Sequence, residues 1–182
     1  MAKTYTAAGT VVAGEVYTAA AHNIIATDVN NLIVPPACRA VRATAQTIAT
    51  GTDTFVTWPT ESYDTDGMFT AGSDTITIQT AGLYIVTCSI SFVVNATGFR
   101  VVNLYKSPSS ATNFAVVFAN SWHGTAGAGL GTTVHCSGVT TFAAGDTVKV
   151  GVAQSSGGNL DVGNASFSDS NHVSVTWIGR TS

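Results

Sequence analysis

Residues 61–92 read ESYDTDGMFTAGSDTITIQTAGLYIVTCSISF, and this stretch decides the fold. Its first part is polar and rich in turn-forming residues, and its last part begins at an Ala-Gly turn. From Leu83 to Val94 apolar and polar side chains alternate, which is the pattern of a β-strand with one face in a core. The apolar face consists of Tyr84, Val86, Cys88, Ile90, Phe92 and Val94.

The rest of the chain after Pro36 has the same β character. Short segments rich in apolar residues are separated by clusters of Gly, Ser, Asn or Pro, and no helical stretch lies between them. This spacing predicts an all-β sandwich or jelly roll. The expected strands are Arg39–Ile48, Thr75–Gln79, Leu83–Val94, Phe99–Lys106, Ala111–Trp122, Gly131–Phe142, Asp146–Ala153 and His172–Ile178.

Two of these expected strands are apolar on both faces. In Phe114–Trp122 one face carries aromatic residues and valine, and the other carries Ala115, Val117 and Ala119. Such a strand in an antiparallel sandwich lies unusually deep or meets another subunit, and we favour the subunit contact. The predicted interface residues are Phe99, Val101, Tyr105, Phe114, Val116, Phe118 and Trp122.

The composition excludes several classes of protein. Charged residues make up 9% of the 182 residues, against about 25% in typical soluble domains. A net charge of −3 offers no electrostatic footprint for nucleic acid. No apolar run is long enough to cross a bilayer, and Glu15 in a segment without an apolar core argues against a signal peptide. The low charge fits a surface of hydroxyls and amides, a surface hidden against other copies, or a mixture of both.

Residues 1–36 are expected to form an N-terminal arm, and residues 37–182 the head. Thr27 would cap a short helix over Asp28–Leu32, and Thr18 is an alternative, earlier cap. Pro35-Pro36 breaks any helix and marks the boundary. The arm has no core of its own, so it should dock on the head, on a neighbouring copy or on a partner. The docking candidates are Val16, Tyr17, Ile24, Ile25, Val29 and Leu32.

The segment 63–92 resembles the central signature of the complement C1q globular head. In that family an aromatic-acid-x-x-Gly-x-Phe segment leads to a strand, and Gly-x-Tyr opens a long strand. Residues 137–152 (SGVTTFAAGDTVKVGV) and 164–179 (NASFSDSNHVSVTWIG) resemble the family's late hairpin and last strand. The resemblance covers about residues 37–180, and its signature residues here are Tyr63, Gly67, Phe69, Gly82, Tyr84, Phe92, Gly145, Asp146 and Trp177.

The resemblance implies a ten-stranded jelly roll, shared with tumour necrosis factor, that assembles as a homotrimer. It also implies aromatic residues buried along the three-fold axis, and a binding or structural role without catalysis.

The arm carries a second resemblance. AGEVYTAAAHNIIATDVNNLIVPP at 13–36 is similar to the N-terminal attachment segments of tailed-bacteriophage structural proteins. This implies a virion protein, assembled in the host cytoplasm and displayed on the particle surface as a minor tail, fibre or capsid decoration protein. Other virion proteins would be partners of the arm. The alternative is an adhesin head that binds a host glycan or protein through the loops 107–113, 123–130 and 154–164.

No catalytic, metal or cofactor motif stands out. The Gly-rich segment 124–133 lacks the lysine and the following helix of a phosphate loop, and His22, His123, His135 and His172 have no metal-site spacing. Calcium binding by Glu61, Asp64 and Asp66 is an alternative to their being solvated turn residues. A glycosidase would need paired carboxylates in a groove, which the few acids disfavour. Cys38, Cys88 and Cys136 are expected to be buried free thiols, with a disulfide as the alternative.

Overall fold

The computed structural model describes residue 16 and residues 18–108, 115–123, 131–163 and 171–181, without the side chains of 121–123. One helix and twelve strands lie in these ranges. They are α1 (Ala19–Ile33), β1 (Ala37–Val41), β2 (Gln46–Ile48), β3 (Thr54–Phe55), β4 (Thr60–Asp64), β5 (Thr75–Thr77), β6 (Gly82–Phe92), β7 (Phe99–Ser107), β8 (Ala115–His123), β9 (Thr132–Phe142), β10 (Thr147–Gln154), β11 (Leu160–Val162) and β12 (His172–Gly179).

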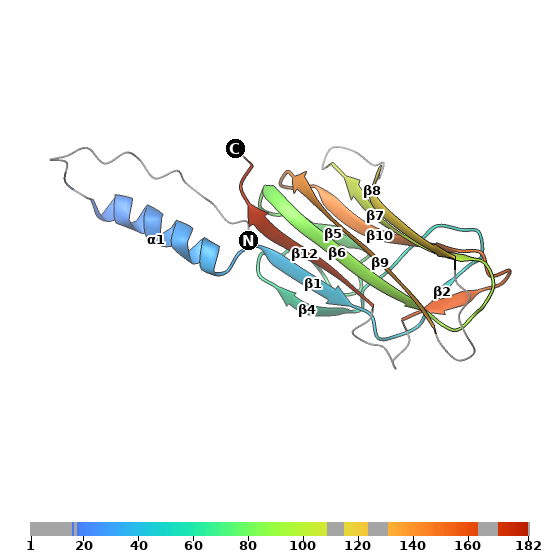
Figure 1. Cartoon of the computed structure of the whole chain (residues 1–182). Coiled ribbons are helices and arrows are strands. Elements are labelled where there is room, and N and C mark those ends of the chain that lie inside the picture. Colours follow the sequence, from blue (N-terminus) through green and yellow to red (C-terminus); the bar gives the residue numbers. More distant parts are fainter. Residues whose placement is uncertain (1–15, 17, 109–114, 124–130, 164–170, 182) are drawn as a thin grey trace.

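Two antiparallel sheets face each other and form a sandwich (Figure 1). In the seven-stranded sheet β9 pairs with β6 along its whole length, and β12, β1 and β4 follow on the other side of β6. The five-stranded sheet runs from β8 through β7 to β10, which also pairs with β3 and β5. Strands β8 and β9 are therefore edge strands of different sheets.

The core lies between the sheets and follows the predicted alternation. On β6 the side chains of Tyr84, Val86, Cys88, Ile90 and Phe92 are all at most 2% exposed. The strand ends at Phe92, and Val94 is 49% exposed, so the expected apolar face is two residues too long. The twelve strands exceed the ten that the resemblance implies, and four of the twelve (β2, β3, β5 and β11) are short pieces of two or three residues.

The strand register defines two ends of the sandwich. At the arm end α1 joins β1, and β6 begins at Gly82 opposite Phe142. Strand β7 ends there, with Ser107 opposite Thr147. At the distal end β6 ends at Phe92 opposite Thr132.

The polar half of the opening stretch is a turn organised by one carboxylate. Asp64 accepts hydrogen bonds from the backbone N–H groups of Asp66 (3.0 Å), Gly67 (2.8 Å) and Phe69 (2.8 Å). Gly67 has φ +71°, a conformation that favours glycine. The turn places Phe69 in the core at 8% exposure. The signature spacing therefore has a local structural reason in this chain.

The second half of the signature forms a tightly packed corner at the arm end. A Cβ on Gly82 would lie 2.1 Å from Trp177 Nε1, so only glycine leaves room for the indole. The hydroxyl of Tyr84 donates to Thr80 O at 2.6 Å, and its ring packs edge-on against Phe142 at a centroid distance of 5.7 Å.

The late hairpin closes the same end. Gly145 N–H donates to Ile78 O at 2.7 Å, and Asp146 accepts a hydrogen bond from Ala143 N–H at 3.0 Å. The Asp146 carboxylate also pairs with Lys106 Nζ at 3.0 Å. The turn therefore ties β9 and β10 to β7.

Strand β8 contains a bulge that changes which side chains face outward. Leu104 is opposite Phe118, but Tyr105 is opposite Val116, so Val117 is an extra residue. Because opposite residues share a face, Phe118 joins Leu104 on the core side and Val116 joins Tyr105 outside. Phe118 is half-buried against the core and Val116 is 48% exposed. The prediction that Val116 and Phe118 share a face is wrong, because the bulge breaks the two-residue alternation.

Helix α1 begins at the earlier of the two expected caps. Thr18 Oγ1 accepts a hydrogen bond from Ala21 N–H at 3.2 Å, and the helix then runs for 15 residues to Ile33. The prediction of a start at Thr27 is therefore nine residues too late, since the Thr18 cap and the Ala-rich segment after it already favour helix. Figure 1 shows α1 extending away from the sheets, and none of its residues is buried.

The junction between arm and head is fixed by hydrogen bonds. Pro35 O accepts from Thr65 Oγ1 at 2.6 Å, and Pro36 O accepts from Trp177 N–H at 2.9 Å. The two prolines thus end the helix and also dock on strand β12 and on the turn after β4.

Candidate functional site

The outer face of the larger sheet is without formal charge over three adjacent strands. Strands β9, β6 and β12 contain no Asp, Glu, Lys or Arg. Their outward positions carry hydroxyls, two histidines and a few aliphatic side chains. A face of this kind can be covered by another chain without the cost of desolvating ions.

The aliphatic side chains of this face lie near its arm end. Ile85 is 37% exposed and lies opposite Val139, which is 51% exposed. Ile178 on β12 is also 51% exposed. We call Ile85, Val139 and Ile178 the apolar patch.

Two polar rows follow the apolar patch toward the distal end. In the first row Thr87 lies between Ser137 and Ser174, and in the second Ser89 lies between His135 and His172. The whole face therefore combines an apolar patch with neutral hydrogen-bonding groups, and it lacks the charged residues that are depleted at the core of protein interfaces.

The outer face of the smaller sheet is covered within the protomer around β7 and β10, whereas Val116 on the edge strand β8 is exposed. The hydroxyl of Tyr105 donates to the Asp53 carboxylate, and its ring packs edge-on against Phe55 at a centroid distance of 5.3 Å. Burial raises the pKa of Tyr105, and the hydrogen bond to Asp53 raises it further. Lys149 Nζ lies 4.8 Å from the Phe55 ring centroid and pairs with Asp74 at 2.9 Å.

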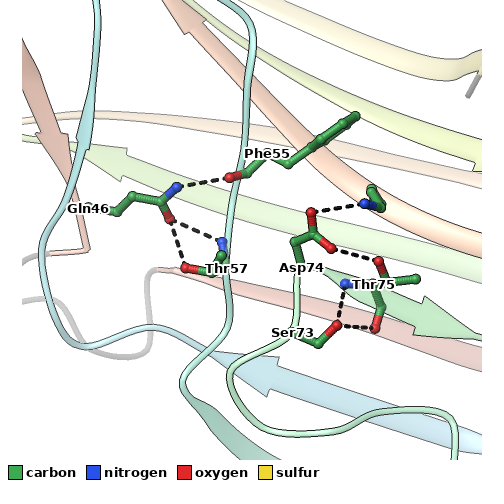
Figure 2. Close-up of polar contacts among 7 residues, drawn as sticks. Gln46, Phe55, Thr57, Ser73, Asp74 and Thr75 are labelled. Atoms are coloured by element: carbon green, nitrogen blue, oxygen red, sulfur yellow. Dashed lines mark hydrogen bonds and ion pairs between the residues drawn. The ribbon is translucent and has the colours of Figure 1, made fainter.

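Short polar contacts hold the covering segments in place. Figure 2 shows Gln46 donating to Phe55 O at 2.8 Å and accepting from Thr57 N–H at 3.0 Å. In the same view Thr75 donates to Asp74 at 2.6 Å. The segments around β3 and β5 are thus fixed to the body of the sandwich.

The predicted interface residues are distributed over different environments. Phe99, Val101 and Tyr105 are half-buried in β7, whereas Val116 is exposed and Phe118 packs inward. Phe114 and the side chain of Trp122 lie outside the described residues. Their assignment to a subunit contact stays a prediction. The apolar patch was missed because Ile85, Val139 and Ile178 occur singly among Thr and Ser, and only the strand register brings them together.

The prediction that the signature residue Tyr63 belongs to the core is wrong. It lies on β4, the edge strand of the larger sheet, and it is 42% exposed. Its neighbour Asp64 forms the turn, but the tyrosine ring itself is not part of the core. The sequence does not predict a strand at Thr60–Asp64, because the residues of this segment are polar and none of them is buried.

The arm docking candidates are solvent-exposed in the protomer. Val16 is 86% exposed, Leu32 60%, Val29 46%, Ile25 41% and Ile24 38%. Tyr17 lies outside the described residues. An isolated helix of this length is marginal in water, and the docking of these exposed aliphatic side chains stays a prediction.

The acidic cluster does not form a cation site. All three hydrogen bonds of the Asp64 carboxylate go to backbone N–H groups of its own turn, Asp66 is 1% exposed, and Glu61 is exposed on β4. Within the described ranges, no group of three or more His, Cys, Asp or Glu side chains is placed to hold a metal ion. Helix α1, the one helix in those ranges, is too short to span a membrane.

The predicted ligand loops do not share one end. Ser107 and Ala115, which flank residues 109–114, lie at the arm end, since Ser107 is opposite Thr147 and Ala115 is opposite Lys106. His123, which precedes residues 124–130, is opposite Phe99 at the distal end. The grouping of 107–113 with 123–130 and 154–164 is therefore wrong, because consecutive hairpins alternate between the ends.

Comparison with solved structures identifies the architecture. Murine APRIL superposes with a TM-score of 0.61 at 12% identity, covering 79% of this chain and 98% of that one. Eiger TNF from S. frugiperda gives 0.58 at 11% identity, covering 81% and 96%. The globular domain of zebrafish complement 1qA gives 0.52 at 16% identity, covering 80% and 99%. No family model matches the sequence, and no curated protein matches it.

These likenesses confirm the predicted fold class. The head is an all-β jelly roll of the tumour necrosis factor and C1q type. At such low identity the likeness extends to the fold alone.

Proposed function

We propose that the chain is a non-catalytic homotrimeric head that is attached to a bacteriophage virion by its N-terminal arm. The observation that carries this proposal is the uncharged outer face of β6, β9 and β12 with its exposed apolar patch. The number of subunits comes from the resemblance to the C1q head, and the virion from the resemblance of the arm.

The energetics favour association through this face. Fully burying one exposed valine or isoleucine side chain contributes about 1.5–3 kcal/mol, and Ile85, Val139 and Ile178, which are 37–51% exposed in the protomer, would each contribute part of this. The surrounding Ser and Thr hydroxyls can exchange water for hydrogen bonds to the neighbouring subunit at little cost. The exposed Val116 on the edge strand β8 would extend the same contact around the edge of the sandwich.

The arm supports attachment because none of the residues of its helix is buried among the described residues. Ile25, Val29 and Leu32 lie on one side of α1 at the i, i+4, i+7 spacing of a contact stripe. The arm joins the head at the end opposite the distal connections, so a head held by its arm would direct its distal end outward. The proposed location is the virion surface, after assembly in the host cytoplasm.

The alternative function is a receptor-binding head that contacts a host glycan or protein. The observation in favour of this alternative is the orientation of the head, since the strand ends that flank residues 124–130 and 164–170 lie at the distal end. A virion protein and an adhesin are compatible roles. Binding of the full-length protein to host cells, measured with and without a competing glycan library, tests whether the protein also acts as an adhesin.

The proposed location is tested by labelling purified particles with antibodies to the head and imaging them by electron microscopy. We expect label at regular sites on intact particles, and loss of the label when particles are assembled with the double variant Ile25→Asp, Val29→Asp. The matched control Asn23→Asp, Asn30→Asp adds the same charge to the opposite side of α1 and should leave the label in place. Absence of the chain from washed particles would contradict the proposal.

A further inference from the structure

Two of the three cysteines face each other across neighbouring strands. Cys88 on β6 lies directly opposite Cys136 on β9, and both are free thiols. Cys88 is 2% exposed and Cys136 is 6% exposed. The third cysteine, Cys38, lies on β1, and β12 separates β1 from β6.

The geometry of this pair suits a disulfide. Opposite residues in an antiparallel ladder have Cα atoms about 4.5 or 5.5 Å apart, and a disulfide spans Cα separations of roughly 4.4–6.8 Å. Cys38 is two strands away from Cys88, about 10 Å at the normal strand spacing, which is too far for a bridge.

Cys136 is also the cysteine of the pair that lines a crevice. A crevice of about 450 Å³ lies between the edge strands β8 and β9, and Cys136 is part of its wall together with Phe118, Asn120 and Ser137. Asn120 Nδ2 donates to His135 O across the crevice, so polar groups line its mouth. Cys88 lies one strand further from this opening.

The two thiols differ in acidity, and the more acidic one is that of Cys136, which lines the crevice. The hydrogen bond from Cys88 lowers the pKa of Cys136, although burial opposes the shift. The hydrogen bond to Cys136 and burial both raise the pKa of Cys88. Since the thiolate is the nucleophile, Cys136 is the first of the pair to react.

We propose that Cys88 and Cys136 form an oxidisable dithiol, a modification site for small disulfides of the glutathione class that enter through the crevice between β8 and β9. The Cys136 thiolate attacks one sulfur of the disulfide, which forms a mixed disulfide and releases one glutathione thiolate. Cys88 then loses its proton to that thiolate and attacks Sγ of Cys136, which releases the second glutathione. The protein loses two electrons and two protons, and glutathione disulfide is reduced to two glutathione molecules.

The bridge would tie the edge strand β9 to β6 on the core side of the uncharged face. The proposal of an oxidisable dithiol rests on the strand register and on the crevice between β8 and β9, and it does not depend on the proposed virion function.

The test exposes the reduced full-length protein to glutathione disulfide, blocks remaining thiols with N-ethylmaleimide after unfolding, and measures intact mass and peptides. We expect a loss of the mass of two hydrogen atoms, one blocked thiol at Cys38, and a linked peptide pair containing Cys88 and Cys136. The variant Cys38→Ser should form the same bridge. The variant Cys88→Ser should stop at a glutathione adduct on Cys136, and Cys136→Ser should leave Cys88 unmodified.

Two results would overturn the proposal. One is three blockable thiols after exposure, with far-ultraviolet circular dichroism showing the native fold. The other is oxidation that occurs only at denaturant concentrations that unfold the protein. If a serine variant does not fold, the order of reaction is read from wild-type protein quenched at early times, where an adduct must appear on Cys136 before the bridge.

Discussion

The two sheets of the sandwich each turn one face outward, and these faces differ in charge and in how far the chain itself covers them. On the smaller sheet Phe55 packs on Tyr105, and Lys149 pairs with Asp74, so the polar and aromatic groups find partners within the protomer. On the larger sheet the apolar patch of Ile85, Val139 and Ile178 remains exposed among neutral side chains. The first face is covered by its own chain around Tyr105 and Phe55, with Val116 exposed on its edge strand β8, whereas we propose that another chain covers the second face.

The largest expected effect comes from placing a charge in the apolar patch. Val139→Arg should dissociate the assembly and raise the protein concentration at the midpoint of dissociation at least about 100-fold. The reason is that the contact loses a buried valine and leaves a guanidinium unpaired in each copy. The matched control is Val94→Arg, since Val94 is 49% exposed but lies beyond the end of β6. Sedimentation velocity over a concentration series measures both. If Val116→Arg dissociates the assembly and Val139→Arg does not, the contact is on β8 instead.

The next effect should be on the protomer and leave assembly unchanged. Asp64→Ala removes the acceptor of three backbone N–H groups and should lower the free energy of unfolding by about 2–3 kcal/mol. Denaturant unfolding measures it, with Glu61→Ala on the same edge strand as the control that changes stability by less than about 0.5 kcal/mol. An equal loss in both variants would mean that the turn is not organised by Asp64.

A smaller effect tests whether the face of the smaller sheet is complete in one chain. Tyr105→Phe keeps the packing on Phe55 and removes the hydrogen bond to Asp53, so it should cost about 1 kcal/mol of unfolding free energy. The sedimentation coefficient of the assembly should not change. A dissociated assembly would place Tyr105 in the subunit contact, as the sequence predicts, and would remove the contrast between the faces.

The smallest effect is a pH dependence of stability on the same face. Burial raises the pKa of Asp74, but hydrogen bonds from Thr75 and Lys149 and the charge of Lys149 outweigh it, and the pKa falls below the usual 3.8. A lowered carboxyl pKa stabilises the fold above the unfolded value, and this contribution is lost as the pH falls through the folded value. The free energy of unfolding of the wild type should therefore exceed that of Asp74→Asn by about 0.5–1 kcal/mol at pH 7. This difference should shrink below pH 3.8. A difference that is constant from pH 7 to pH 2.5 would assign the effect to packing instead.

The fold could be predicted where alternation and turn chemistry agree. The core face of β6 follows from the spacing of Tyr84, Val86, Cys88 and Ile90, and the turn after β4 follows from Asp64 and Gly67. Strand β4 was missed because an exposed edge strand needs no apolar residues.

The candidate site was predicted less well, for three physical reasons. The bulge at Val117 reverses the alternation, and no local sequence feature marks it. The exposed partners Ile85 and Val139 are 54 residues apart in sequence and meet only through the register. The helix start was expected at Thr27, although the Ala-rich segment after Thr18 favours the earlier cap that the structure uses.

The most direct test of the central claim is the molar mass of the full-length protein in solution at micromolar concentration, measured by sedimentation equilibrium. A trimer that associates through the uncharged face of β6, β9 and β12 has three times the 18.6 kDa of one chain, and this is the mass that we expect. A mass of 18.6 kDa at every concentration would show that this face stays in water, and would contradict the account.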